Sequence, residues 1–267
     1  MSAARSILAR VDAMIESSTL DPETGGELDL DVANAGLEGK SAEAIVRWAG
    51  ERFGRGLVLS SSFGAQSAVM LHLVTRVLPE IPVVWVDTGY LFPETYRFAA
   101  ELTERLGLNL KVYSPAMTPA RFEAVHGKTW EEGVEGLDAY HEVFKVEPMR
   151  RALRELGATA WFAGLRAKQS DTRASLRALG AQDGVVKVHP ILSWTTKQVH
   201  DYLTDHDLPY HPLVEQGYAS IGDVHSTRPI TAGEDERAGR FGGLKQECGI
   251  HLPTTREEAE SRDASGL

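Results

Sequence analysis

The chain has 267 residues, of which 42% are hydrophobic and 25% charged, and its formal net charge is −10. This composition is typical of a soluble globular protein, and the acidic balance argues against a general nucleic-acid or membrane binder. No run of about 18 apolar residues is present, and the first residues lack the apolar stretch of a signal peptide. The single cysteine, Cys248, cannot form an internal disulfide, so we expect a cytoplasmic protein.

The N-terminal part of the chain, residues 1–40, is predicted to be an acidic arm. Its stretch 16–31 carries six acidic residues, no basic residue and a Gly-Gly pair, a pattern typical of a segment outside the folded body. Residues 41–54 then predict an amphipathic helix. Ser41 is the expected N-cap of this helix and Gly54 the expected end.

From residue 56 onward, short apolar runs alternate with amphipathic segments. This alternation predicts a mostly parallel, twisted α/β sheet with helices on both faces. Pro148 is expected at the first turn of its helix, where a missing N–H costs nothing. The predicted strands are 56–60, 81–87, 108–114, 158–164 and 185–192, and the predicted helices between and after them are 65–78, 94–107, 148–157 and 193–208.

These patterns divide the chain into four predicted parts. The acidic arm is followed by an α/β domain at 41–209 and by a C-terminal segment at 210–252. That segment is rich in Gly, His and Pro, has little periodicity and carries the cysteine. Long irregular segments of this kind are often functional, so we expect a functional segment here. Residues 253–267 are predicted to be a disordered tail.

The turn "LSSSFGAQS" follows the first predicted strand and begins a helix. In an open parallel sheet such a turn lies at the carboxyl ends of the strands, where ligands bind. Serine hydroxyls and the N–H groups of a helix N-terminus together favour a phosphate. The turn has neither the G-K-[ST] ending of a Walker loop nor a G-x-G-x-x-G pattern, and a plain helix cap explains it equally well. The candidate binding residues here are Ser60, Ser61, Ser62, Phe63, Gly64 and Gln66.

Two further loops follow predicted strands and carry polar or basic side chains. "WVDTGYLFPET" places Asp87, Thr88 and Gly89 after the second strand. Asp87 could hold a ribose hydroxyl or could form an Asx turn before the next helix. "GLRAKQSDTRAS" follows the fourth strand. Because three such loops meet at one edge of the sheet, a ligand site there is favoured over three unrelated turns. The candidates from this third loop are Arg166, Lys168, Gln169 and Arg173.

Six motifs follow one another in order over residues 40–252: "SSSFGAQ", "DTGYLFPETYRF", "KVEPMRRAL", "GLRAKQSDTRAS", "YHPLVEQGYASIGDVHSTRP" and "GRFGGLKQECGIH". Together they resemble the phosphoadenylyl-sulfate reductase family of assimilatory sulfate reduction, and the terminal E-C-G-I-H block is highly specific. The resemblance implies the adenine-nucleotide hydrolase-like fold. It also implies that the α/β domain at 41–209 binds a nucleotide and that the segment at 210–252 is catalytic and mobile.

The first loop distinguishes this chain from the ATP pyrophosphatases that share the implied fold. Those relatives carry S-G-G-x-D-S, where this chain has Phe63 and Gln66 in place of a glycine and the aspartate. A neutral amide cannot bind a metal as a carboxylate does. The sequence therefore disfavours ATP cleavage and favours a nucleotide whose reactive bond lies elsewhere.

The related adenylyl-sulfate reductases hold an iron–sulfur cluster with two Cys-Cys pairs. The corresponding stretches here, "YHEVFKVEP" and "ASIGDVHSTRP", contain no cysteine, and such a cluster needs about four thiolates. We therefore expect no cluster and no other bound cofactor. Within the family, absence of the cluster accompanies the 3′-phosphorylated substrate, which favours phosphoadenylyl sulfate (PAPS) over adenylyl sulfate.

The chemistry that the resemblance implies is attack of a thiolate on the sulfur of the substrate. The implied nucleophile is Cys248, which would become an S-sulfonate as the adenosine bisphosphate leaves. The cations that lower the pKa of the thiol and neutralise the transferred group would be Lys145, Arg237 and Arg240. His225 and His251 are expected to line the same site.

A single cysteine leaves no resolving thiol in the chain, so an external dithiol must release sulfite. Thioredoxin or glutaredoxin is the implied partner, and the resemblance also allows a homodimer. The histidines lack paired metal-binding spacing, so we predict no metal site. One non-enzymatic alternative remains, a nucleotide-binding sensor in which Cys248 is oxidised without turnover.

Overall fold

The computed structural model describes residues 28–169, 173–231, 233–245 and 249–251. Cys248, most of the predicted acidic arm and the predicted tail lie outside these residues. Within them, one sheet contains six strands. The strands are β1 Leu57–Ser60, β2 Pro82–Val86, β3 Asn109–Tyr113, β4 Ala160–Phe162, β5 Leu179–Gln182 and β6 Val185–Val188.

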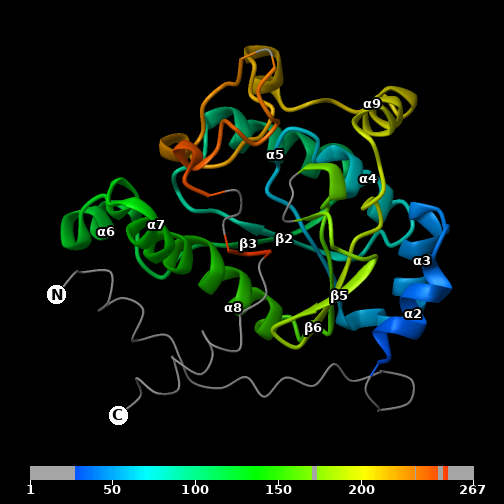
Figure 1. Cartoon of the computed structure of the whole chain (residues 1–267). Helices are drawn as coiled ribbons and strands as arrows, with labels where there is room; N and C mark the ends of the chain where they lie inside the picture. The colour runs from blue at the N-terminus through cyan, green and yellow to red at the C-terminus, as the bar shows by residue number, and fades with distance from the viewer. Residues whose placement is uncertain (1–27, 170–172, 232, 246–248, 252–267) are drawn as a thin grey trace, which may run out of the picture.

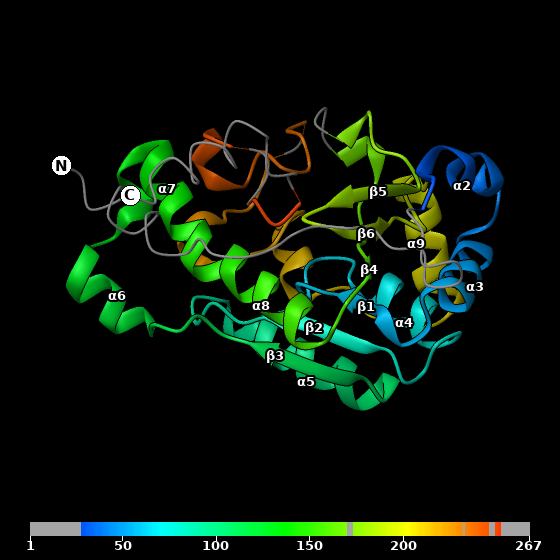
Figure 2. The same cartoon turned by 90° about the horizontal axis from the view of Figure 1, so that it is seen from below.

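The order of the strands across the sheet is β3-β2-β1-β4-β6-β5 (Figures 1 and 2). All neighbouring pairs are parallel except β5 and β6. The chain runs outward from β1 through β2 to β3 and then returns to place β4 on the other side of β1. The order therefore reverses at β1 and β4, and such a switch point leaves a crevice at the carboxyl ends of the two strands.

The predicted α/β fold class is confirmed, and each of the five predicted strands contains one observed strand. The sequence interpretation missed β5, an antiparallel edge strand of four residues. Asp183 and Gly184 join β5 to β6, and both have positive φ angles, 50° and 75°. An Asp-Gly pair between two strands is a strong hairpin signal, so the sequence carried the information that identifies β5.

Alternate residues of the central strands pack into two separate cores, one on each face of the sheet. Leu57 and Leu59 of β1 belong to one core, and Val58 belongs to the other. The first core receives side chains from α3 Ala42–Phe53, α4 Ala68–Thr75, α5 Pro93–Leu106 and α9 Thr196–Asp205, and the second from α8 Glu147–Glu155. Figures 1 and 2 show α8 on the face opposite α4 and α5. Burial on both faces explains why the strands read as continuous apolar runs.

Helix α3 begins and ends where the sequence predicts. The Ser41 hydroxyl accepts a hydrogen bond from the Ala44 N–H, which satisfies one N–H of the first turn. Gly54 follows the last residue of the helix with a φ of 48°, a conformation that favours glycine.

The predicted acidic arm is wrong for its last residues, because Leu30–Leu37 form helix α2. Asp29 caps this helix by accepting hydrogen bonds from the Asp31 and Val32 N–H groups. Asn34 then anchors the helix to the sheet. Its amide donates to the Leu179 carbonyl at 3.0 Å and accepts from the Leu179 N–H at 2.9 Å. The acidic composition of this stretch concealed a helix that is stabilised mainly by tertiary contacts.

The helix predicted to begin at Pro148 starts much earlier in the structure. Helix α7 Gly133–His141 continues through a π-helical stretch, Glu142–Val146, directly into α8. Proline cannot donate the usual helical hydrogen bond, and a wider π turn accommodates such an interruption without ending the helix. Lys145 lies on this π turn. Helix α6 Pro119–His126 also lies in a region where no helix was predicted.

The segment after residue 209 contains only short 3₁₀ turns among its described residues, in agreement with its lack of periodicity. Figure 1 shows it in orange near α5. The His211 N–H donates to the Ala65 carbonyl at 3.1 Å, and Asp223 forms an isolated bridge with Leu91. The segment is thus attached to loops at the carboxyl edge of the sheet. In the described part of the chain, the helices are too short or too polar to cross a membrane.

Replacing Asn34 with Ala is expected to destabilise the protein. The change leaves the backbone N–H and carbonyl of Leu179 without their partner, which costs about 1–3 kcal/mol per unsatisfied buried group. Val32→Ala is the matched control, because Val32 lies on the same helix and is 68% exposed; it should change the free energy of unfolding by less than about 0.5 kcal/mol. Urea denaturation measures both variants. Equal effects would show that α2 is not held by Asn34.

Candidate active site

A cavity opens at the carboxyl ends of β1 and β4, at the switch point of the sheet. Its volume is about 270 Å³. This volume lies near the lower end of the usual range for small-molecule sites, about 300–1,000 Å³. The predicted site residues that line it are Ser60, Ser61, Ser62, Gly64, Gln66, Thr88, Lys145, Arg166, Gln169, Arg173, Arg237, Arg240 and His251.

The loop between β1 and α4 lines the cavity with its serines and its backbone. The Ser60 hydroxyl already accepts a 2.6 Å hydrogen bond from the Trp161 indole, and the Ser61 hydroxyl accepts from the Phe63 N–H. Phe63 has a φ of 48° and its ring is fully buried against Trp85. The Phe63 ring therefore packs into the hydrophobic core beneath the loop and does not line the cavity.

The loop after β2 contributes one predicted site residue to the cavity, and the other two belong to a turn. Thr88 is buried and lines the cavity, whereas Asp87 and Gly89 do not. The Asp87 carboxylate accepts hydrogen bonds from the Gly89 N–H at 2.9 Å and from the Tyr96 hydroxyl at 2.7 Å. This geometry is the Asx turn that the sequence offered as the alternative to ribose binding.

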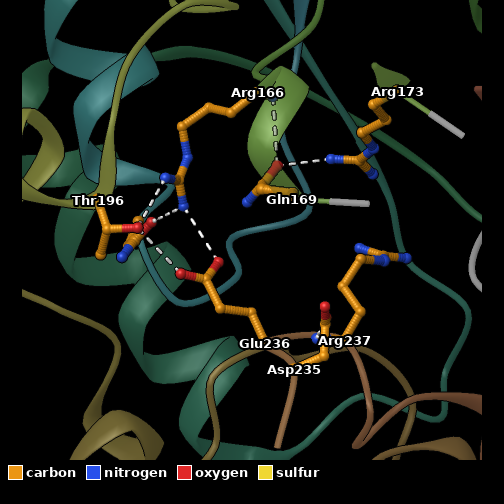
Figure 3. Close-up of polar contacts among 8 residues, drawn as sticks. Arg166, Gln169, Arg173, Thr196, Asp235, Glu236 and Arg237 are labelled. Atoms are coloured by element: carbon orange, nitrogen blue, oxygen red, sulfur yellow. Dashed lines mark hydrogen bonds and ion pairs between the residues drawn. The ribbon is translucent and has the colours of Figure 1, made fainter. Parts of the chain in front are cut away.

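The loop after β4 carries two buried arginines that lie on either side of Gln169 (Figure 3). The Gln169 Oε1 accepts a hydrogen bond from the Arg173 guanidinium at 2.6 Å and another from the Arg166 N–H at 3.3 Å. The Gln169 side chain therefore links the Arg173 guanidinium to the backbone of Arg166. Lys168, the third predicted base of this loop, is exposed and does not line the cavity.

The Arg166 guanidinium is bound by three side chains from separate parts of the fold. It donates to Gln66 at 3.0 Å, to Thr196 at 3.2 Å and to the Glu236 carboxylate at 3.3 Å. Thr196 also donates to Glu236 at 3.1 Å, which closes the network drawn in Figure 3. Burial lowers the pKa of Arg166, and Glu236 opposes that effect. A carboxylate thus lies against the most buried cation of the cavity.

A second carboxylate binds the cation on the π turn. Lys145 Nζ lies 2.5 Å from Asp223 Oδ2, and the Thr88 hydroxyl donates to Asp223 Oδ1 at 2.7 Å. Burial alone would raise the pKa of Asp223, but Lys145 and Thr88 outweigh it and hold the pKa below the usual range. Asp223 is therefore ionised at neutral pH and forms a buried ion pair with Lys145.

Ile250 and His251 connect the C-terminal segment to β5 and β6. The Ile250 carbonyl accepts from Gln182 at 2.9 Å, and Lys187 Nζ lies 3.1 Å from His251 Nδ1. An ammonium has no acceptor, so Nδ1 accepts and the ring proton remains on Nε2. Burial and the nearby Lys187 keep the pKa of His251 well below its usual value. His251 is thus a neutral hydrogen-bond donor at the cavity lining.

Two other histidines, His225 and His211, pack against side chains outside the cavity lining. His225, which the sequence suggested for the site, does not line the cavity; its ring stacks on Trp130 with centroids 4.0 Å apart. Burial lowers its pKa to about 4. His211 is fully buried, with Thr95 3.0 Å from its Nε2. Among the described residues, no three His, Cys, Asp or Glu side chains are grouped as metal ligands would be.

The sequence interpretation missed the two carboxylates of the cavity, Asp223 and Glu236. Asp223 lies in the motif "ASIGDVHSTRP", and Glu236 lies shortly before the motif "GRFGGLKQECGIH". Cationic side chains were predicted for the site because the expected ligand is anionic. The same clustering of arginines could have indicated the carboxylates, because buried charges are normally paired.

The sheet and the cavity define the class of the protein: an α/β protein whose switch-point site is suited to an anionic ligand. A family model described as the phosphoadenosine phosphosulfate reductase domain matches residues 56–229. Two curated relatives are named phosphoadenosine 5′-phosphosulfate reductase. The one from Synechocystis sp. is 55% identical over 90% of this chain and 98% of the relative. The one from Synechococcus sp. is 58% identical over 82% and 95%.

Solved structures agree with these sequence matches. A phosphoadenylyl-sulfate reductase from Candida auris, in a phosphate complex, matches with a TM-score of 0.66 and 31% identity over 74% of this chain and 95% of that chain. The FMN adenylyltransferase of Candida glabrata matches with a TM-score of 0.54 at 14% identity, over 98% of this chain and 86% of that chain, and shows a shared fold only. The chain belongs to the phosphoadenosine phosphosulfate reductase family.

Replacing Glu236 with Gln is expected to tighten the binding of an anionic nucleotide. The wild-type protein must separate the Glu236 carboxylate from Arg166 before a phosphate can bind there, and the variant need not. We expect the Kd of adenosine 3′,5′-bisphosphate, measured by isothermal titration calorimetry at low salt, to fall about three- to tenfold.

The matched control for this variant is Glu215→Gln, which removes one exposed negative charge away from the cavity. It should leave the Kd unchanged within about twofold. Weaker binding by Glu236→Gln would mean that Glu236 supports the site and does not compete with the ligand.

Proposed function

We propose that the protein reduces phosphoadenylyl sulfate to sulfite and adenosine 3′,5′-bisphosphate in sulfate assimilation. The observation that carries this proposal is the convergence of five cationic side chains on one cavity whose lining also includes Ile250 and His251, close in sequence to Cys248. Membership of the reductase family supports it. The five cations are Lys145, Arg166, Arg173, Arg237 and Arg240.

The first step is transfer of the sulfonyl group to the enzyme. The Cys248 thiolate attacks the sulfur of the substrate, an S–S bond forms, and the bond between sulfur and the bridging phosphate oxygen breaks. The leaving adenosine 3′,5′-bisphosphate keeps the electron pair of that bond. The cations of the cavity stabilise the negative charge on the sulfonyl oxygens and on the leaving phosphate, and they favour the thiolate over the thiol.

The second step is release of sulfite by an external dithiol. One thiolate of the dithiol attacks Cys248 Sγ, sulfite leaves with the electron pair of the S–S bond, and a mixed disulfide remains. The second thiol of the partner displaces Cys248, which returns as a thiolate while the partner is oxidised to a disulfide. Because the chain has one cysteine, we assign the two electrons to thioredoxin or glutaredoxin in the cytoplasm.

The C-terminal segment has to serve both steps in this scheme. Cys248 must reach a nucleotide in the cavity and then a protein-sized reductant, so movement of the segment remains part of the proposal. Gly242 and Gly243 both have positive φ angles, 59° and 81°, and glycine accommodates such backbone changes readily. The homodimer that the family resemblance allows stays a prediction.

Intact-mass spectrometry tests the proposal. Incubation of the reduced protein with phosphoadenylyl sulfate is expected to add one sulfonate group, and reduced thioredoxin should remove it as sulfite appears. Cys248→Ser is the control variant: it should form no adduct but should bind adenosine 3′,5′-bisphosphate as the wild type does.

Each alternative gives a different result in the same assay. Faster labelling by adenylyl sulfate would identify that nucleotide as the substrate. A redox sensor would show oxidation of Cys248 by peroxide but no adduct with either donor, and this outcome would contradict the reductase function itself.

A further inference from the structure

Asp223 is a fully buried carboxylate in the lining of a cavity that otherwise gathers cations. An acidic side chain at this place opposes an anionic substrate and is also costly to bury, so its presence requires a physical reason. Both of its oxygens are engaged. Oδ1 accepts from the Thr88 hydroxyl at 2.7 Å, and Oδ2 lies 2.5 Å from Lys145 Nζ.

The backbone around Asp223 is held as firmly as its side chain. Asp223 forms an antiparallel bridge with Leu91, and the Val224 N–H donates to the Tyr90 carbonyl at 2.8 Å. Leu91, Tyr90 and Thr88 all belong to the loop after β2, whereas Lys145 comes from the π turn before α8. The carboxylate therefore connects three segments of the chain at one point and cannot rotate away from Lys145 without breaking the Thr88 bond.

The neighbouring residue, Gly222, makes room for a second cation of the cavity. A Cβ at Gly222 would lie only 2.2 Å from Arg240 Nη2 and 2.4 Å from Arg240 Nη1. The guanidinium thus packs directly on the glycine backbone. Lys145 therefore lies against Asp223 Oδ2, and Arg240 lies against the main chain of the adjacent Gly222.

Lys145 needs such a partner because only 7% of its surface is exposed. Burial favours the neutral amine, and a lysine in an apolar site commonly loses its proton near neutral pH. An adjacent carboxylate reverses that tendency. An ammonium has three donors, and contact with one carboxylate oxygen leaves others that can bind the substrate.

We propose that Asp223 is a positioning residue of the reductase: it keeps Lys145 charged and directed into the cavity for transfer of the sulfonyl group. The inference rests on the proposed function. Asp223 itself does not touch the substrate in this account. It acts through Lys145, and Thr88 acts through Asp223 by fixing the carboxylate.

Several titratable side chains surround the Lys145–Asp223 pair, and their pKa values determine whether they change charge above neutral pH. Burial lowers the pKa of His141 to about 2 and that of His225 to about 4, and it raises the pKa values of Tyr90 and Tyr140 far above their usual range. The neutral histidines and tyrosines therefore do not change charge between about pH 7 and pH 10. The other charged groups that act on the pair or on these four side chains are Arg240, Lys245 and Glu123.

The direct test is the pH dependence of sulfonate transfer in Asp223→Asn. Single-turnover formation of the adduct, followed by rapid quench and mass spectrometry, should be about ten- to a hundredfold slower than in the wild type at pH 7.5. The deficit should grow as pH rises toward about 9.5, because a buried lysine without its carboxylate deprotonates in this range. The Kd of adenosine 3′,5′-bisphosphate should change less than the rate.

A double-mutant cycle separates positioning from mere structural support. Lys145→Met should slow transfer at every pH, and adding Asp223→Asn to it should cost less than about a further twofold, since the residue through which Asp223 acts is gone. Removing both charges also avoids an unpaired buried ion, so the double variant remains a folded reference. Additive losses, or a pH-independent deficit in Asp223→Asn, would overturn the proposal.

Two further variants complete the design. Thr88→Val keeps the volume and the ion pair but frees the carboxylate, and it should give a smaller deficit with the same growth toward alkaline pH. Asp201→Asn removes the carboxylate of an exposed ion pair on α9 and should transfer as the wild type does. If the wild-type protein forms no adduct at all, the proposed function fails; if it does and Asp223→Asn equals it, only the role of Asp223 fails.

Discussion

Five cationic side chains line one partly buried cavity, and the repulsion among them must be offset by negative charge. In a medium of reduced dielectric, like charges a few ångströms apart cost several kcal/mol. Two carboxylates offset this cost in different ways. Asp223 is fully buried and fixed by Thr88, so it is a permanent partner of Lys145. Glu236 is more exposed and reaches Arg166 from the C-terminal segment, so a ligand phosphate can replace it.

The fold places these cations and carboxylates at the carboxyl edge of the sheet. Reversal of the strand order at β1 and β4 opens a crevice at the carboxyl edge of the sheet. The loops after β1, β2 and β4 reach this crevice, as does the π turn that carries Lys145. The C-terminal segment supplies both carboxylates and is fastened to the loop after β2 through Asp223. The cations of the cavity and the C-terminal segment are therefore linked through charge.

Much of the fold and of the candidate site could be predicted from the sequence, because apolar strands, helix caps and basic loops leave local patterns. Ser41 and Gly54 delimit α3 as expected, and the loops with Ser61 and Arg166 do line one cavity. What failed depends on tertiary contacts: α2 is held by Asn34, and α7 and α8 form one helix despite Pro148. The side chains that pair with cations across the cavity, Asp223 and Glu236, could not be recognised by local spacing, because their partners are 70 or more residues away.

A structure of the protein with adenosine 3′,5′-bisphosphate tests the central claim most directly. The account predicts a phosphate group within hydrogen-bond distance of Arg166, a Glu236 carboxylate that has moved away from that guanidinium, and a Lys145–Asp223 pair that is unchanged. A nucleotide bound outside the switch-point cavity would contradict the account. So would a complex in which Glu236 keeps Arg166 while the Lys145–Asp223 pair separates.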